Sequence, residues 1–267
     1  MSRLGVGKTA LVTGASSGIG KAFAEVLAEH GFGLILTARR RDRLDELAAD
    51  LTRRYDVPAT VIVADLADPD AAARIVEAIG GTRVDVLVNN AGYGVPGSYG
   101  QVPWADHQRF MQVMVTAVCD LTYRLLPGMV DAQWGRIINV ASVAGLVPAP
   151  AGHTLYGASK AFLVRFSEAL SAENRSKGVH VTAVCPGFTY SEFHDVTGTR
   201  ERMNRLPSVL WLSAPAVAHE GYDAVMRGDP VVVNGWVYRC LLWLIGIAPD
   251  RLVRAVSSGA GRRYRKV

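Results

Sequence analysis

Residues 9–20 read TALVTGASSGIG, an apolar run followed at once by a turn that contains three glycines. The run predicts a buried strand at Thr9–Thr13, and the spacing of apolar residues beyond the turn predicts a helix that ends at Gly31. Glycines in such a turn allow backbone N–H groups to approach a pyrophosphate, which the positive end of the helix dipole also attracts. The stretch therefore predicts a strand, a turn and a helix that together bind a dinucleotide.

The same alternation of short apolar runs and longer segments of helical period continues along the chain. The runs are apolar on both sides, which is expected for parallel strands covered by helices on both faces of a sheet. Asp68 and Pro69 are expected as the N-cap and the first turn of the third helix. The predicted fold class is a Rossmann-type, doubly wound α/β sheet, which binds its ligands at the carboxyl ends of the strands. Further strands are expected at Gly33–Ala38, Ala59–Ala64, Val84–Asn89, Arg136–Val140, Val179–Val184 and Val231–Val233.

The length of 267 residues and the hydrophobic share of 49% suit one domain with a large core. We predict a single catalytic domain over residues 1–235, followed by an apolar and then basic appendix over residues 236–267. Within the domain, an irregular apolar segment at about residues 188–215 is expected to form a substrate lid.

Much of the net charge of +5 comes from Arg262, Arg263, Arg265 and Lys266 at the end of the chain. The chain shows no known motif of nucleic-acid readers, so we expect no nucleic-acid partner. Residues 1–8 contain no apolar stretch of the kind that a signal peptide needs, which predicts a cytoplasmic protein.

The chain contains three cysteines, Cys119, Cys185 and Cys240. They lie far apart and show no CxxC spacing, so neither a metal site nor a disulfide framework is predicted. Each is expected to be a small buried residue.

The end of the second predicted strand reads Thr37-Ala38-Arg39-Arg40. Enzymes that prefer NAD usually present Asp or Glu to the ribose 2′-hydroxyl at this place, and no carboxylate is available here. Guanidinium groups suit a 2′-phosphate through their charge and their paired donors. The segment predicts NADP(H) as cofactor, and a solvated helix cap is the alternative explanation of the two arginines.

Five motifs in a fixed order resemble those of the classical short-chain dehydrogenase/reductase family. They are the GxxxGxG turn that begins at Gly14, Asn89-Asn90-Ala91-Gly92 after the fourth strand, Ser142 after the fifth, Tyr156 with Lys160, and Pro186-Gly187 after the sixth. The resemblance runs to about Arg227, and the layout of the substrate end resembles the ketoacyl-reductase and 17β-hydroxysteroid-dehydrogenase branch. It implies an NADP(H)-dependent oxidoreductase that interconverts a ketone and a secondary alcohol, and a homodimer or homotetramer.

The resemblance also assigns the residues that hold the cofactor. Asp65 and Leu66 would contact the adenine, Asn90 the adjoining ribose, and the segment with Thr189 and Ser191 the nicotinamide carboxamide. The full set expected to bind the cofactor is Gly14, Ser16, Ser17, Gly18, Ile19, Gly20, Arg39, Arg40, Asp65, Leu66, Asn90, Tyr156, Lys160, Thr189 and Ser191.

Tyr156 and Lys160 stand four residues apart and therefore share one face of a helix. A free phenol is a poor base at neutral pH, and an ammonium group within reach lowers its pKa. By resemblance, Ser142 donates a hydrogen bond to the substrate oxygen. We therefore expect Ser142, Tyr156 and Lys160 to be catalytic, with Tyr156 protonating the carbonyl oxygen as NADPH delivers hydride.

One position departs from the family pattern. Counting back from Pro127 places Met114 where the family has an Asn that holds a water linked to the catalytic lysine. A thioether does not bridge water, so the route that resupplies Lys160 with protons is in question. A dinucleotide-binding regulator without turnover is the alternative function that this departure raises.

The substrate end is rich in apolar residues, which predicts a lipophilic ketone, with a 3-oxoacyl chain as one candidate. Trp236–Ile247 is also strongly apolar, and at 12 residues it is too short to span a membrane. Three roles stay open for it, in decreasing order of expectation: packing against a substrate channel, an interface between copies, or contact with a membrane surface.

Overall fold

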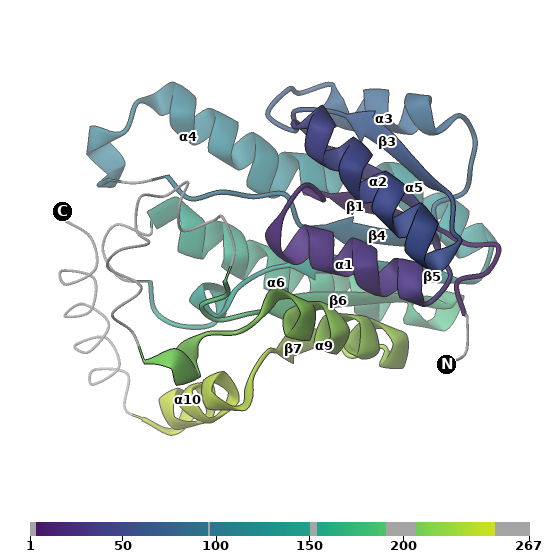
Figure 1. The fold of residues 1–267 in the computed structure, drawn as a ribbon. Coiled ribbons are helices and arrows are strands. Elements are labelled where there is room, and N and C mark those ends of the chain that lie inside the picture. The colour runs from purple at the N-terminus through teal and green to yellow at the C-terminus, as the bar shows by residue number, and fades with distance from the viewer. Residues whose placement is uncertain (1–3, 96, 150–153, 191–206, 249–267) are drawn as a thin grey trace.

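The computed structural model describes residues 4–95, 97–149, 154–190 and 207–248. Its centre is a sheet of seven parallel strands in the order β3-β2-β1-β4-β5-β6-β7 (Figure 1). The order reverses between β1 and β4, which is the switch point where such sheets bind ligands. The predicted fold class is confirmed. The strands are β1 (Thr9–Thr13), β2 (Gly33–Ala38), β3 (Ala59–Val63), β4 (Val86–Asn89), β5 (Gly135–Val140), β6 (Val179–Cys185) and β7 (Val231–Val233).

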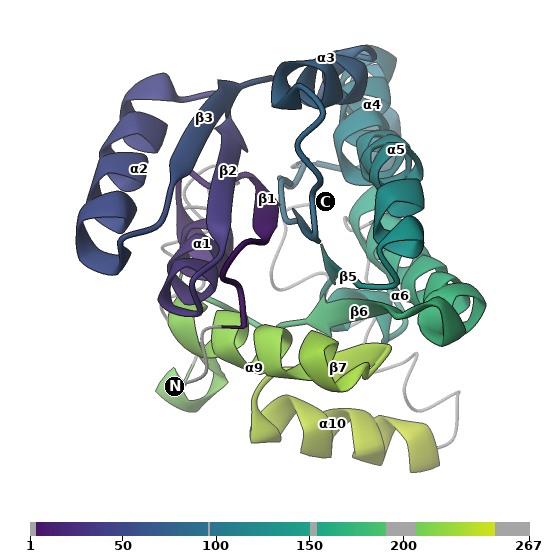
Figure 2. The same cartoon turned by 90° about the vertical axis from the view of Figure 1, so that its right-hand side faces the viewer.

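Helices cover both faces of the sheet, as the apolar strands predicted (Figure 2). On one face lie α1 (Gly18–Glu29), α2 (Arg41–Tyr55) and α9 (Ala214–Arg227), whose apolar sides form one core with β1 and β2. On the other lie α3 (Ala71–Ile79), α5 (Ala117–Asp131) and α6 (Thr154–Asn174). The two cores hold the central strands between them, whereas the edge strands β3 and β7 are partly exposed.

The longest helical segment of the described chain follows β4 and packs with its inner side on the sheet. It consists of α4 (Trp104–Met111), a π-helical turn η2 (Gln112–Thr116) and α5, without a break from Trp104 to Asp131. Length and composition would allow this helix to cross a membrane, and within the described ranges it alone has both properties. Its inner side packs against the sheet, with Met114 and Leu121 fully buried, which is typical of a core helix.

The predicted boundaries differ from the structure by one or two residues in several elements. The prediction for the third helix was wrong, because α3 begins at Ala71 rather than directly after Asp68. The Asp68 carboxylate accepts a hydrogen bond from the N–H of Asp70 at 3.0 Å. The Asp68 carboxylate is thus engaged in a local turn three residues before the first residue of the helix, Ala71.

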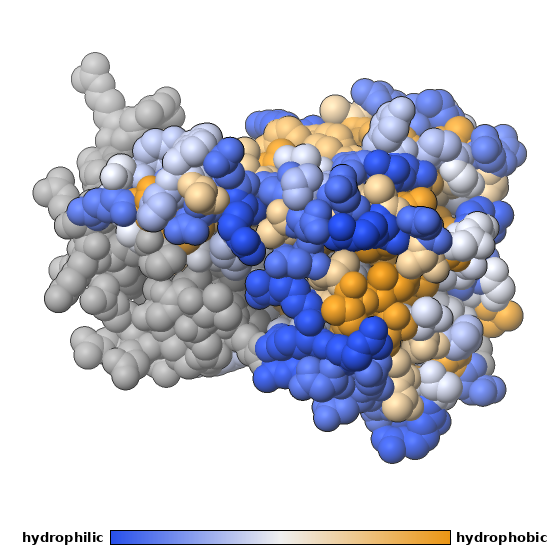
Figure 3. Space-filling view, turned by 90° about the horizontal axis from the view of Figure 1, so that it is seen from above, coloured by the Kyte–Doolittle hydropathy of each residue, from blue (hydrophilic) through white to orange (hydrophobic). Residues whose placement is uncertain are grey.

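Short 3-10 turns and one further helix complete the fold. The turns are η1 (Tyr99–Gln101), η3 (Val143–Gly145), η4 (Arg175–Lys177) and η5 (Ser208–Leu210). The last described helix, α10 (Trp236–Ile247), lies at the outer edge of the molecule beside α9 and β7 (Figures 1 and 2). The opposite face, seen from above, is mainly hydrophilic with smaller apolar areas between the charged groups (Figure 3).

Candidate active site

The glycine-rich turn after β1 is tied directly to the end of β4. The Thr13 hydroxyl donates to the carbonyl of Val88 at 3.1 Å and accepts from the N–H groups of Asn90 and Ala91 at 2.9 and 3.1 Å. The Asn90 side-chain amide donates to the carbonyls of Thr13 and Gly14 at 3.0 and 3.2 Å. Two of the predicted motifs therefore meet at the switch point and hold each other in place.

This contact explains two of the glycines. Gly14 has a φ of +65°, and Gly20 faces Asn90 so closely that a Cβ there would stand 2.4 Å from the Asn90 Nδ2 and from the carbonyl oxygen of Gly14. Any side chain at Gly20 would push α1 away from the turn. The glycines thus permit both the turn and the close approach of the α1 N-terminus, which is the anion-binding end of a helix.

Arg40 lies across the same turn. Its guanidinium donates to the hydroxyls of Ser16 and Ser17 at 2.9 and 3.0 Å, while Arg39 is exposed. Hydroxyls, backbone amides and two guanidinium groups are donors that suit phosphates, and none is a carboxylate that would repel a 2′-phosphate. The residues at the ends of β1 and β2 therefore fit the phosphates of NADP(H).

The end of β3 supplies the predicted adenine side. Asp65 accepts from the N–H of Ala67 at 3.0 Å, and its other oxygen stands 3.6 Å from the guanidinium of Arg109 on α4. The next residue, Leu66, is buried. Burial raises the pKa of the nearby Tyr93, and the positive charge of Arg109 acts in the opposite direction. The contacts of Asp65, Leu66 and Asn90 with the cofactor stay predictions.

Lys160 is a buried cation beside a phenol. Its side chain is only 6% exposed, and its ammonium nitrogen lies 5.7 Å from the centroid of the Tyr156 ring. The nitrogen donates to the carbonyl of Val140 at 2.7 Å, at the end of β5. Burial lowers the pKa of Lys160 to about 8. At neutral pH the group is therefore still a cation, and it can assist the loss of a proton from Tyr156.

Ser142 is fixed two residues beyond Val140. Its hydroxyl donates to the carbonyl of Pro186 at 3.4 Å and accepts from the N–H of Ala144 at 3.1 Å, which caps η3.

The turn η3 packs directly on α6, because a Cβ at Gly145 would stand 2.5 Å from the backbone of Lys160. This contact sets the serine against the helix that carries Tyr156. The roles of Gly145 and of the Val140 carbonyl were missed, because a backbone contact leaves no side-chain signal in a sequence.

The remaining predicted residues fall in different places. Thr189 is buried and pairs with Leu212, so the two flanks of the predicted lid lie side by side. Ser191 lies outside the described residues, as does most of that lid.

Met114 is 1% exposed and lies in the π-helical turn η2. Its sulfur packs against Gly92 so closely that a Cβ added to Gly92 would stand 2.9 Å from it. The thioether fills this space beside the Asn89–Gly92 segment.

A pocket opens beside Tyr156 that the sequence did not reveal. His107 on its wall stacks on Tyr99 with ring centroids 4.6 Å apart, and its Nε2 lies 3.0 Å from the Tyr99 carbonyl. The segment before α4 follows no regular period, so nothing in the sequence indicated which of its residues face the site. The pocket is lined by Val95, Gly97, Tyr99, Val102, His107, Phe110, Thr154, Leu155 and Tyr156.

The three cysteines follow the expectation of burial only in part, and Cys119 is half-buried. Cys185 is buried at the end of β6, and burial raises the pKa of its thiol to about 12. Cys240, by contrast, is exposed on α10, so its predicted burial was wrong. The error arose because α10 presents apolar residues to solvent, against the usual pattern.

Comparison with known proteins places this geometry in a family. The family model described as short chain dehydrogenase matches residues 8–202. The chain is 34% identical over 265 residues to the very-long-chain 3-oxoacyl-CoA reductase-B of Danio rerio, covering 97% of this chain and 82% of that protein. It is 39% identical over 243 residues to the very-long-chain 3-oxoacyl-CoA reductase of Anas platyrhynchos, covering 89% and 77%.

Solved structures agree with the sequence relatives. A short-chain dehydrogenase from Sphingobium yanoikuyae in complex with NADPH matches with a TM-score of 0.79 and 30% identity, covering 91% of this chain and 99% of that one. A 7beta-hydroxysteroid dehydrogenase matches with a TM-score of 0.84 and 25% identity, covering 97% and 100%. The prediction of an NADP(H)-dependent oxidoreductase that interconverts a ketone and an alcohol is confirmed, and the regulator without turnover is not favoured. The chain belongs to the short-chain dehydrogenase family.

Proposed function

We propose that this chain reduces the 3-keto group of a long 3-oxoacyl thioester to a 3-hydroxyl group, with NADPH as reductant. The relatives with the same motifs are named very-long-chain 3-oxoacyl-CoA reductases, and they cover most of this chain. The observation that carries the proposal is the group of Ser142, Tyr156 and Lys160, in which the Ser142 hydroxyl and the Lys160 ammonium are held at the end of β5 and the ammonium lies beside the Tyr156 ring.

Each of the three residues has a distinct task in this reaction. When bound, the cofactor supplies a hydride to the carbonyl carbon. Tyr156 donates its hydroxyl proton to the carbonyl oxygen, and the Lys160 ammonium stabilises the phenolate that results. Ser142 donates a hydrogen bond that holds the carbonyl oxygen near the phenol. The Val140 carbonyl positions Lys160 by accepting a hydrogen bond from its ammonium group, with an N···O distance of 2.7 Å.

Aromatic side chains on the flanks of the predicted lid can contact the lipophilic part of the substrate. Trp211 stacks on Tyr190 with ring centroids 4.5 Å apart and contacts Phe188 at 6.0 Å. Tyr190 is 53% exposed, so part of this aromatic group faces outward, where an acyl chain can cover it. Such coverage would add binding free energy in proportion to the apolar area removed from water.

The experiment that tests the proposal measures NADPH oxidation by the purified chain. A long-chain 3-oxoacyl thioester is compared with a simple methyl ketone, and Tyr156→Phe serves as the inactive control. We expect a much higher kcat/KM for the thioester. A chain that oxidises NADPH with neither substrate, although it binds the cofactor, would contradict the proposed reaction.

We further propose that the chain acts as a homodimer or homotetramer in the cytoplasm. Tyr123 on α5 is 80% exposed and Phe162 on α6 is 40% exposed, on neighbouring helices of one side of the sheet (Figure 2). Exposed aromatic residues of this kind are enriched at interfaces. Light scattering on the purified protein tests the assembly, and Tyr123→Glu should shift its mass towards the monomer.

A further inference from the structure

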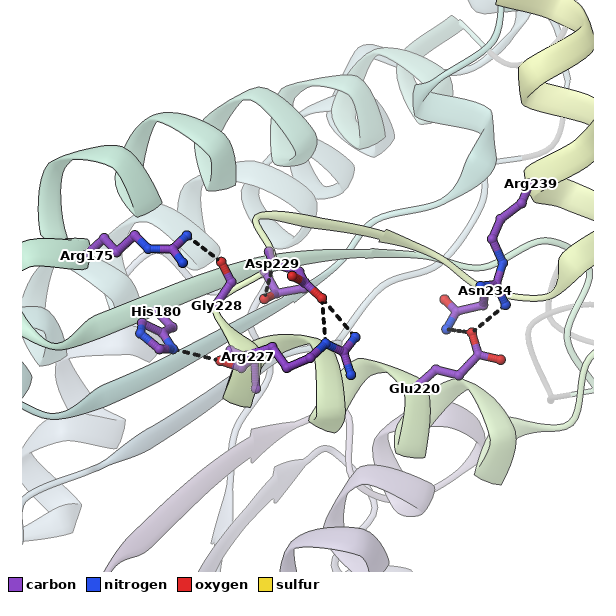
Figure 4. A network of polar contacts seen from close by, with 10 residues as sticks. Arg175, His180, Glu220, Arg227, Gly228, Asp229, Asn234 and Arg239 are labelled. Carbon is purple, nitrogen blue, oxygen red and sulfur yellow. Dashed lines mark hydrogen bonds and ion pairs between the residues drawn. The ribbon is translucent and has the colours of Figure 1, made fainter.

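The inner side of α10 is firmly attached to the body of the molecule. Tyr238 is 4% exposed, and its hydroxyl accepts from the N–H of Phe188 at 2.9 Å and donates to the carbonyl of Leu210 at 2.6 Å. Arg239 stands 3.8 Å from Glu220 on α9, which also accepts from Asn234 at 3.3 Å (Figure 4). These contacts fix which side of the helix faces inward.

The outer side of α10 is apolar and uncovered in the described chain. Trp236, Trp243, Leu244 and Ile247 are 68%, 66%, 52% and 65% exposed, and Cys240 is exposed with them. Their spacing of four, three, one and three residues places all five on one stripe of a helix. The helix contains no acidic residue. Uncovered apolar stripes of this size mark interaction surfaces.

Positive charge is concentrated directly after this helix. Residues 249–267 contain six basic side chains and one acidic side chain, a net charge of +5. The whole chain has 29 basic and 24 acidic residues, which leaves 23 of each sign in residues 1–248. The entire net charge of the protein therefore belongs to the segment that follows the apolar stripe.

We propose that the outer side of α10 lies in the surface of an anionic lipid bilayer, with the basic residues that follow it attracted to the headgroups. Twelve residues of helix extend about 18 Å, short of the roughly 30 Å that a spanning helix must cross. A helix of this length with one apolar face lies in the plane of the interface. Tryptophan is the side chain most suited to that depth, and α10 exposes two of them, Trp236 and Trp243.

Charge favours a lipid partner over a second copy of this chain. Two copies joined through α10 would each bring to the complex a following segment with a net charge of +5, and like charges oppose such an association. An anionic bilayer instead attracts the same residues within a Debye length of its surface. The proposal does not depend on the identity of the substrate.

The test uses the full chain with sedimenting vesicles of phosphatidylcholine, with or without phosphatidylglycerol. We expect binding to the vesicles that contain phosphatidylglycerol, weakened by salt, together with a blue shift of tryptophan emission. The double variant Trp236→Glu with Trp243→Glu should lose affinity by at least about tenfold. Trp104→Glu is the matched control, because Trp104 is 62% exposed on α4, away from α10, and should leave vesicle binding unchanged.

Three results would overturn the proposal. One is a full chain that stays in solution with anionic vesicles at low salt. Another is a double variant that binds vesicles as tightly as the control while both retain NADPH binding, which serves as the check on folding. The third is a dimer, measured by light scattering, that the double variant dissociates and that binds no lipid, since α10 would then join copies of the chain.

Discussion

The Arg40 guanidinium donates to the Ser16 hydroxyl at 2.9 Å, and thereby links the end of β2 to the glycine-rich turn after β1. A neutral hydroxyl is a weaker partner for a guanidinium than a phosphate is. The cation is therefore held in place before the cofactor arrives, at the point where a 2′-phosphate would replace a weaker acceptor with a stronger one.

We predict that the chain binds NADPH at least about tenfold more tightly than NADH, because charged hydrogen bonds to the 2′-phosphate exist only in NADPH. Arg39→Ala and Arg40→Ala should each reduce this preference, measured by fluorescence titration of both cofactors. Arg53→Ala is the control, since Arg53 is 79% exposed near the other end of α2 and carries the same charge. Equal affinity for the two cofactors in the unaltered chain would contradict the prediction.

Tyr156→Phe should lower turnover by about two to four orders of magnitude, which is the usual contribution of a positioned general acid. NADPH binding should stay nearly intact, because the ring and its packing remain. Lys160→Ala should reduce both turnover and cofactor affinity. Steady-state kinetics and cofactor titration separate the two effects, with Tyr123→Phe on the exposed side of α5 as control. Retention of most activity by Tyr156→Phe would show that another group supplies the proton.

The sequence predicted those parts of the fold in which the pattern of apolar residues along a segment matches the secondary structure that the segment adopts. Apolar runs such as Gly33–Ala38 became strands with the expected bounds, because both faces of a parallel sheet are buried. The placement of the glycine-rich turn and of Asn90 at the carboxyl ends of strands was also predicted, because doubly wound sheets bind their ligands there; the hydrogen bond of the Asn90 N–H to the Thr13 hydroxyl was not.

Other features follow from tertiary contacts that no local pattern records. The π-helical turn around Met114 depends on how the helix passes Gly92, and the stacking of His107 on Tyr99 depends on an irregular segment. The apolar period of α10 was visible in the sequence. Which of its sides faces inward follows from the hydrogen bonds of the Tyr238 hydroxyl and the ion pair of Arg239 with Glu220, and such tertiary contacts have no signature in composition or spacing.

Lys160 should destabilise the cofactor-free protein at neutral pH. Burial lowers its pKa from 10.5 to about 8, so below pH 8 the folded state holds a charge that the unfolded state solvates better. Lys160→Met should then raise the free energy of unfolding, by up to about 3 kcal/mol less the lost hydrogen bond to Val140.

The sign of this effect sets its pH dependence. Between pH 8 and 10.5 the unfolded chain binds the proton that the folded chain has released, so the stability of the unaltered protein rises with pH in that window. The advantage of Lys160→Met should therefore shrink across it. Denaturant titrations at neutral pH and near pH 10.5 measure this, with Lys21→Met on exposed α1 surface as control. A constant difference across the window would refute the assignment of the pKa to Lys160.

Met114→Asn should destabilise the protein rather than restore a water relay. Met114 is 1% exposed against Gly92, so an amide there would be buried, and an unpartnered buried amide costs about 1 to 3 kcal/mol. Thermal melting and turnover across pH, measured on the same samples, distinguish the outcomes. A variant with unchanged melting temperature and higher turnover at high pH would show that the position does serve proton supply.

Substrate chain length should control the specificity constant. The pocket beside Tyr156 is lined by Phe110, Leu155 and Val102, and Trp211 with Tyr190 offers a second apolar surface near the flanks of the predicted lid. Each methylene that these surfaces cover should add roughly 0.8 kcal/mol, or about fourfold in kcat/KM. Across a series of 3-oxoacyl thioesters of increasing length, kcat/KM should therefore rise steadily. It should level off once the apolar surface is covered. Trp211→Ala should lower the plateau and leave the shortest substrates unaffected, because only long chains reach that ring. A flat profile across the series would mean that these residues pack on the body of the protein and do not bind substrate.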